Sequence, residues 1–195
     1  MKRILLLVVA MMMFCPKGVL AEKVEYEYCL EQVLVTVNNE NVTLKCNTEK
    51  DLMKYEDEFV DFEWEITDIP RFHLTNKTQN TIKLVWNDAV YQDDKGNTQK
   101  VMHEGVRFID KSKDIPESSI LSLGNINEIV LPVDHIIYFN GWTIYPLFSD
   151  KVKHKYIKNA TDRINKNIKI MLPFVIGSDL YEYTFIFKIT NVIVS

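Results

Sequence analysis

The sequence predicts an all-β domain, an antiparallel β-sandwich, and three observations lead to this prediction. Apolar and polar residues alternate over much of the chain, as they do in strands with one face on a core and the other in water. Polar breaks of hairpin length, rich in Asn, Asp and Gly, separate these runs. Helical spacing is almost absent. Many short strands with short connections are typical of sandwiches.

The clearest strand lies at residues 59–67, where four apolar residues point one way and three acidic residues point the other. Because the acidic side chains share a water face, we interpret them as solubilising and as a guard against edge pairing rather than as an acid/base couple. In chain order, the predicted strands are 32–37, 42–46, 59–67, 71–75, 81–91, 98–109, 129–131, 136–139, 143–148, 168–173 and 181–194.

Asp93-Asp94-Lys95-Gly96-Asn97 is predicted to be a hairpin turn, with Gly96 at a position that needs positive φ. The segment also resembles part of a calcium loop. The third loop position is then Lys95 instead of an oxygen ligand, and the glycine comes two residues too early. The sequence therefore favours the turn.

Residues 150–166 depart from the strand pattern. They are rich in Lys and Arg, and Val152, Tyr156, Ala160 and Ile164 recur at every fourth position. This spacing predicts a short helix or a basic loop over one end of the sandwich. The cationic segment is either a solvated connection or a surface for an anionic partner such as a lipid headgroup or polysaccharide.

Residues 1–21 read as a signal peptide. Lys2 and Arg3 precede an apolar run at 4–14, and the sequence around Ala21 suits a signal peptidase. The run is too short to span a bilayer, which needs about 20 residues. Cleavage after Ala21 leaves residues 22–195 as a single β-sandwich domain. Lipidation of Cys15, which would provide a lipid anchor to a membrane, is the alternative, although Phe14 is an unusual residue before a lipidated cysteine.

Export permits a disulfide bond between Cys29 and Cys46, since extracellular compartments are oxidising. Two buried free thiols are the alternative. The chain carries 23 basic and 27 acidic residues, with a net charge of −4, and loss of residues 1–21 would make it more acidic. This balance argues against nucleic acid as a partner, because phosphate binding needs a basic surface.

A polar group composed of His103, Glu104, Asp134 and His135 is the first place to look for an enzyme site that forms only in three dimensions. His103-Glu104 lacks the second histidine of an H-E-x-x-H zinc helix, because Arg107 stands at that position. The sequence shows no nucleophile elbow, phosphate-binding glycine loop or dinucleotide motif. We therefore expect no metal site and no cofactor.

Trp142, Tyr145 and Phe148 follow the Asn140-Gly141 turn and form the candidate binding surface. Amphipathic rings at loop tips are common in recognition patches for proteins and carbohydrates. Packing of the same rings in the core is the alternative.

Several motifs together resemble a group of small bacterial exported proteins and lipoproteins whose function is unassigned. The motifs are FHLTNKTQNTIKLVWN at 72–87, the Asp-Lys-Gly turn at 94–96, VMHEGVRFID at 101–110, and IVLPVD at 129–134 followed by Gly141-Trp142. The resemblance covers residues 59–188. It implies an immunoglobulin-like β-sandwich in the bacterial envelope and provides no catalytic residues.

The sequence thus predicts an exported protein, located in the periplasm, the cell envelope or outside the cell. We expect a non-enzymatic binding or structural module that recognises an envelope protein or glycan through loops or an exposed strand edge. The alternative is a hydrolase or metal-dependent enzyme built on the polar group around His103. A pocket that unites two or more of those side chains would favour the enzyme.

Overall fold

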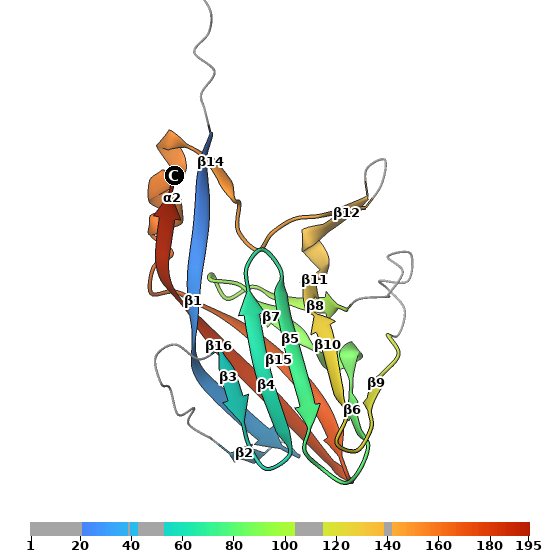
Figure 1. Cartoon of the computed structure of the whole chain (residues 1–195). Helices are drawn as coiled ribbons and strands as arrows, with labels where there is room; N and C mark the ends of the chain where they lie inside the picture. The colour runs from blue at the N-terminus through green and yellow to red at the C-terminus, as the bar shows by residue number, and fades with distance from the viewer. Residues whose placement is uncertain (1–20, 39, 43–52, 104–114, 139–141) are drawn as a thin grey trace, which may run out of the picture.

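The computed structural model describes residues 21–38, 40–42, 53–103, 115–138 and 142–195. Every strand pairing among them is antiparallel. The predicted all-β architecture is therefore confirmed. The strands form a large curled sheet, a small sheet and a separate two-stranded hairpin (Figure 1).

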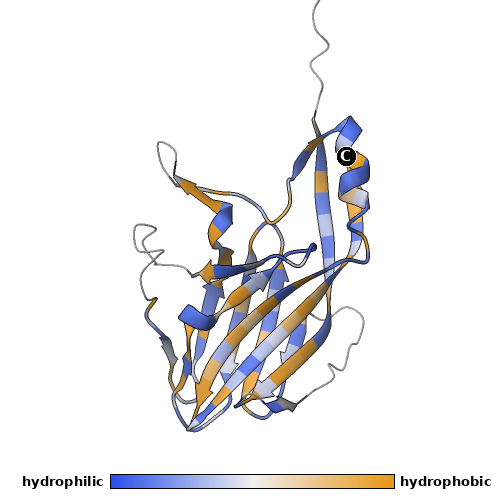
Figure 2. Cartoon of the chain, turned by 180° about the vertical axis from the view of Figure 1, so that it is seen from behind, coloured by the Kyte–Doolittle hydropathy of each residue, from blue (hydrophilic) through white to orange (hydrophobic). Residues whose placement is uncertain are grey.

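The large sheet has the strand order β11-β8-β7-β15-β16-β1-β14. Three further strands join it: β2 pairs with β1, β6 pairs with β15, and β9 pairs with β6. Its strands are β1 Ala21–Val37, β2 Glu40–Val42, β6 Ile82–Leu84, β7 Val90–Gln92, β8 Thr98–Met102, β9 Ser118–Ile120, β11 Leu131–Pro132, β14 Lys151–Lys153, β15 Asn167–Ile176 and β16 Asp179–Val194. Hydrophobic and hydrophilic residues alternate along its long strands (Figure 2).

The small sheet has the order β10-β5-β4-β3 and covers one face of the large sheet (Figure 1). Its strands are β3 Lys54–Glu56, β4 Val60–Ile66, β5 Pro70–Asn76 and β10 Asn125–Ile129. The alternation in β4 is the predicted one: its four apolar residues are buried and Glu63 and Glu65 are exposed.

Aromatic rings from the two sheets meet in the core. The rings of Phe62 and Phe185 have centroids 4.7 Å apart, and Trp64 lies 4.9 Å from Phe185 and 5.1 Å from Phe187. Trp64 is only 4% exposed. Edge-to-face and tilted contacts of this kind stabilise a core beyond the burial of apolar area alone.

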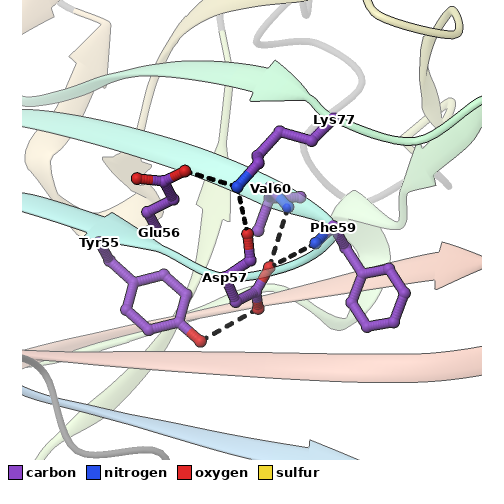
Figure 3. A network of polar contacts seen from close by, with 6 residues as sticks. All are labelled: Tyr55, Glu56, Asp57, Phe59, Val60 and Lys77. Atoms are coloured by element: carbon purple, nitrogen blue, oxygen red, sulfur yellow. Dashed lines mark hydrogen bonds and ion pairs between the residues drawn. The ribbon is translucent and has the colours of Figure 1, made fainter.

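An Asp57 network lies at the β3–β4 turn (Figure 3), and Tyr183 connects it to the large sheet. The Asp57 carboxylate accepts hydrogen bonds from the backbone N–H groups of Phe59 and Val60, at 2.8 and 2.9 Å. It also accepts from the hydroxyls of Tyr55 on the small sheet and Tyr183 on the large sheet, at 3.0 and 2.9 Å. Burial, and then the nearby Asp57 charge, raise the pKa of Tyr183. The tyrosine therefore remains a hydrogen-bond donor.

Beyond the small sheet, residues 21–27 of β1 and 190–194 of β16 continue as a two-stranded ribbon (Figure 1). β14 pairs with β1 along one edge of this ribbon. The register of β1 against β16 shifts between Glu27 and Tyr28 and again between Leu30 and Gln32. Bulges of this kind bend a strand and increase its twist, and these two mark the junction between ribbon and body. The segment 150–166, predicted to be a short helix or a basic loop, contains β14, then a 3₁₀ turn, η4, at His154–Tyr156, and a short helix, α2, at Ile157–Thr161.

The structure also corrects the predicted strand at 81–91. It is divided into β6, a 3₁₀ turn, η1, at Trp86–Asp88, and β7. The turn places Trp86 in the core, 1% exposed, with its Nε1–H donating to Ser118 Oγ at 2.8 Å. Side-chain periodicity does not reveal such a break, because the residues on both sides of it are strand formers.

The predicted hairpin turn at residues 93–97 is confirmed, since it connects the paired strands β7 and β8. Gly96 has a φ of 91°, a conformation in which glycine avoids the steric penalty of a side chain. Asp93 accepts hydrogen bonds from the backbone N–H groups of Lys95 and Asn97 and from the Asn97 side chain. These bonds are those of an Asx-type turn.

Candidate functional site

His103 directly follows β8 of the large sheet. It lies beside the corner where the chain passes from β10 of the small sheet to β11, which pairs with β8 at Met102. Its ring stacks on Trp86 with a centroid separation of 4.4 Å, and its Nδ1 lies 3.5 Å from Glu128 Oε2. Within the described part of the chain, neither ring nitrogen makes a hydrogen bond. The partner that the fold provides is Glu128 on β10, a residue that the sequence analysis did not select.

The other members of the predicted polar group do not join His103. Asp134 and His135 belong to a 3₁₀ turn, η3, Val133–His135, where Asp134 is exposed. His135 Nδ1 lies 3.0 Å from the Pro146 carbonyl oxygen; because a carbonyl only accepts, this nitrogen carries the proton. Glu104 lies outside the described residues. In the described ranges, no three His, Cys, Asp or Glu side chains are placed to hold a metal ion.

The β12–β13 hairpin is the most distinctive surface feature. Its strands, Ile136–Tyr138 and Trp142–Ile144, pair with each other and with none of the other described strands. Ile137, Ile144 and Tyr145 are 49%, 44% and 49% exposed. In Figure 1 the hairpin projects from the body.

One backbone hydrogen bond and one buried side chain hold this hairpin to the body. Ile136 is buried in the core, and the Leu147 N–H donates to the Asp68 carbonyl at 3.0 Å. The Tyr145 N–H donates to the His135 carbonyl at 2.8 Å and closes the base of the hairpin itself. An isolated two-stranded hairpin is marginally stable in water, so these contacts position the exposed residues.

The predicted aromatic surface is divided by the fold. Tyr145 is on the hairpin, and the backbone of Trp142 begins β13, although its side chain is not described. Phe148 instead packs against Tyr26 of the ribbon, with ring centroids 5.0 Å apart, and under Arg163, whose guanidinium carbon lies 4.6 Å from the ring centroid. Phe148 therefore helps to attach the ribbon to the body.

Ile137 and Ile144 lie in predicted strands, but nothing in the sequence indicated that their side chains would be exposed. Alternation shows that two faces differ, and it does not show whether another element covers the apolar one. The separation of the hairpin from both sheets leaves these two isoleucines in contact with solvent.

Two hollows lie elsewhere on the surface. One, of about 300 Å³, is at the base of the ribbon between Tyr26, Tyr28, Asp68 and Phe148. The other, of about 420 Å³, is an open groove on the outer face of the small sheet. Neither is lined by His103, Asp134 or His135.

Of the three cysteines, only Cys29 lies in the described residues. Cys29 is half-buried on β1, and burial raises the pKa of its thiol. Cys46 and Cys15 lie outside the described residues, so the disulfide bond and the lipid anchor stay predictions.

Comparison of the chain with protein-family models, with curated protein sequences and with solved structures gave no match. The resemblance to bacterial exported proteins therefore stays a prediction as well. None of the helices in the described ranges is long and apolar enough to cross a bilayer.

Proposed function

We propose that the protein is a non-enzymatic binding module of the bacterial envelope and that the β12–β13 hairpin is its recognition surface. The observation that carries the proposal is the exposure of Ile137, Ile144 and Tyr145 on a hairpin that pairs with none of the other described strands. Ile137 lies opposite Thr143, and Ile144 lies opposite Ile136, so the two isoleucines occupy opposite faces of the hairpin. Exposed apolar side chains on a projecting element are typical of interaction sites.

The chemistry of the hairpin favours a protein partner over a glycan. Ile137 and Ile144 present branched aliphatic surface and no hydrogen-bonding side-chain group, whereas sugar hydroxyls need hydrogen-bond partners once they leave water. A protein offers apolar pockets for such residues, with an aromatic anchor such as Tyr145 adding to affinity. The free edges of the hairpin would also accept an added strand.

The placement of the polar residues supports a module over a hydrolase or a metal-dependent enzyme. The described histidines of the predicted group have separate surroundings: His135 donates to the Pro146 carbonyl, whereas the His103 ring stacks on Trp86 and its Nδ1 lies 3.5 Å from Glu128 Oε2. General acid/base catalysis needs groups that converge on one substrate position. The described members of this group share neither of the two hollows.

The location and the finer fold belong to the same proposal. The charged start, apolar run and cleavage sequence within residues 1–21 support export to the periplasm, cell envelope or medium. Two antiparallel sheets that pack face to face around an aromatic core support an immunoglobulin-like sandwich.

The function is tested by replacing Ile137, Ile144 and Tyr145 together with serine. The matched control replaces Leu121 and Leu123, which are also exposed but lie beside the β9–β10 turn. Photocrosslinking in intact cells, followed by mass spectrometry, identifies the partner. We expect the hairpin variant to lose one crosslinked protein that the control variant retains. Identical crosslinked products from both variants would contradict the assignment of the site.

Export is tested separately by intact-mass analysis of the protein from its native cells. We expect the chain to begin at Glu22, since the sequence around Ala21 suits signal peptidase. A mass that corresponds to acyl chains on Cys15 would replace this prediction with the lipid anchor.

A further inference from the structure

Four lysines at the ribbon end of the molecule have no acidic partner in the described ranges. They are Lys151 and Lys153 on β14, Lys155 in η4 and Lys158 in α2, and all four are exposed. We call them the ribbon lysines. They are distinct from the neighbouring Arg163 and Lys166, which lie 3.4 and 3.8 Å from the buried carboxylate of Asp94.

The strand register places Lys23, Lys151 and Lys153 on one face of the ribbon, where β1 also carries Glu25 and Glu27. Lys151 lies directly opposite Lys23, and Lys153 lies opposite Ala21. Residues opposite each other share a face, and like charges in this arrangement are destabilising. Glu25 on the same strand contacts Lys23, and Glu22 forms its contact with His154. Neither of these carboxylates pairs with the ribbon lysines.

Apolar and aromatic groups accompany this charge. Tyr156 is 47% exposed, and the Lys155 ammonium lies 4.7 Å from the centroid of its ring. Ile164 and Ile193 are also exposed. A tyrosine beside lysines and scattered aliphatic side chains is the composition that settles at a membrane interface, where the rings lie at the level of the headgroups.

The sequence connects this same end of the molecule to an apolar segment. Ala21, the first residue of β1, pairs with Lys153 of the basic strand β14. The apolar run at 4–14 and Cys15 directly precede it in the sequence. Because an extended chain advances at most about 3.5 Å per residue, Cys15 attaches within roughly 21 Å of Ala21. If Cys15 carried the alternative lipid anchor, this short connection would keep the ribbon lysines close to the headgroups. Cleavage after Ala21, the outcome expected above, removes the connection and leaves the surface to bind by itself.

We propose that the ribbon end docks on an anionic lipid surface, with the ribbon lysines contacting the headgroups and Tyr156 at the interface. Opposite charge favours anionic headgroups, and the exposed side chains of Tyr156, Ile164 and Ile193 favour a bilayer over a soluble polysaccharide. The hairpin proposed above is a different surface, so the two proposals are tested independently.

The test measures sedimentation of the protein that begins at Glu22 with two kinds of vesicle, phosphatidylcholine alone and phosphatidylcholine containing phosphatidylglycerol. The exposed apolar side chains contribute equally to both, so the difference between them reports the lysines. We expect binding to the anionic vesicles to be tighter by on the order of tenfold or more at low salt, and this difference to disappear at high salt. Equal binding to both vesicles at low salt would overturn the proposal.

Two variants with equal losses of charge locate the effect. One replaces the ribbon lysines with glutamine, and the other replaces Lys54, Lys83, Lys100 and Lys169, which are exposed on the body. We expect only the ribbon variant to lose the anionic preference, with circular dichroism confirming that both variants are folded. Equal losses in the two variants would contradict a specific surface. Binding to dextran sulfate that depends on the ribbon lysines, without vesicle binding, would assign the site to a polysaccharide and overturn the proposal.

Discussion

β1 and β16 run side by side through two regions of the molecule that are stabilised in different ways. In the body, β16 contributes Tyr183, Phe185 and Phe187, all fully buried against the small sheet. In the ribbon, the same strand continues through Thr190, Asn191 and Ile193, which are exposed. The β1–β16 strand pair is thus central to the core in the body and largely exposed to solvent in the ribbon.

The ribbon has other sources of order. Its strands keep their backbone pairing, β14 adds three residues to one edge, and Phe148 packs between Tyr26 and Arg163. Strand pairing thus extends beyond the core, whereas most of the buried apolar area is confined to the body. We therefore expect lower local stability in the ribbon, since that stability follows buried contacts. The predictions below test this difference.

The largest expected effect is in the body. Replacing Trp64 with alanine removes a ring that contacts four other aromatic residues, and we expect it to lower the free energy of unfolding by about 3 to 5 kcal/mol. Ile193→Ala in the ribbon is the control, with an expected loss under about 0.5 kcal/mol. Chemical denaturation measures both. Similar losses at the two positions would remove the distinction between the regions.

The junction between the regions contains Cys29, which lies between the two register shifts of β1. If Cys29 and Cys46 are bridged, as the sequence predicts, reduction should destabilise the domain by on the order of 3 kcal/mol. The physical reason is the loop-closure entropy that the bond removes from the unfolded chain. Thiol counting on unfolded, non-reduced protein beginning at Glu22 measures the state of the pair, and two free thiols per monomer would rule the bridge out.

Loss of the Asp57 network should also weaken the body. Asp57→Ala leaves the fully buried Tyr183 without its carboxylate acceptor and frees two backbone N–H groups. We expect a loss of about 2 kcal/mol, because a buried donor without a partner carries a desolvation penalty. Tyr183→Phe, which removes the hydroxyl as well, should be less destabilising in denaturant titrations of Asp57→Ala protein than of the wild type. An additive result would show that the two groups act separately.

The smallest expected effect concerns the Asp93 turn and depends on pH. Burial by itself would raise the pKa of Asp93, but hydrogen bonds from Asn97 and Lys95 lead to a net lowering. A lowered folded-state pKa stabilises the fold above the unfolded value, near 3.9, and this contribution is lost as the pH falls through the folded value. Since the group is largely exposed, we expect less than about 1 kcal/mol.

The measurement for this turn is the stability difference between neutral and acidic pH. Asp93→Asn should show a smaller decrease on acidification than the wild type, and Asp88→Asn, another exposed aspartate, should resemble the wild type. A decrease in Asp93→Asn equal to that of the wild type would show that the Asp93 carboxylate does not contribute.

The elements that the sequence predicted well are those fixed by local chemistry. Alternation predicted β4 and the burial of Trp64 correctly, because one face of the strand meets the core and the other meets water. The turn at 93–97 followed from Asp93 and Gly96, whose backbone preferences act within a few residues. The fourfold spacing at 150–166 predicted less, because only Ala160 of its four residues lies in α2, whereas Val152 lies in strand β14.

Tertiary structure alone decided which segments became neighbours. Cys29 pairs with Lys188, and His103 faces Glu128 instead of the polar residues that the sequence grouped with it. Phe148 packs against Tyr26 instead of joining the predicted aromatic surface, whereas Tyr145 is exposed at the hairpin. Alternation shows which residues share a face of a strand, but the partner of that face depends on register and packing between distant segments. The candidate site is therefore a property of the fold, built from residues whose local pattern is that of ordinary strands.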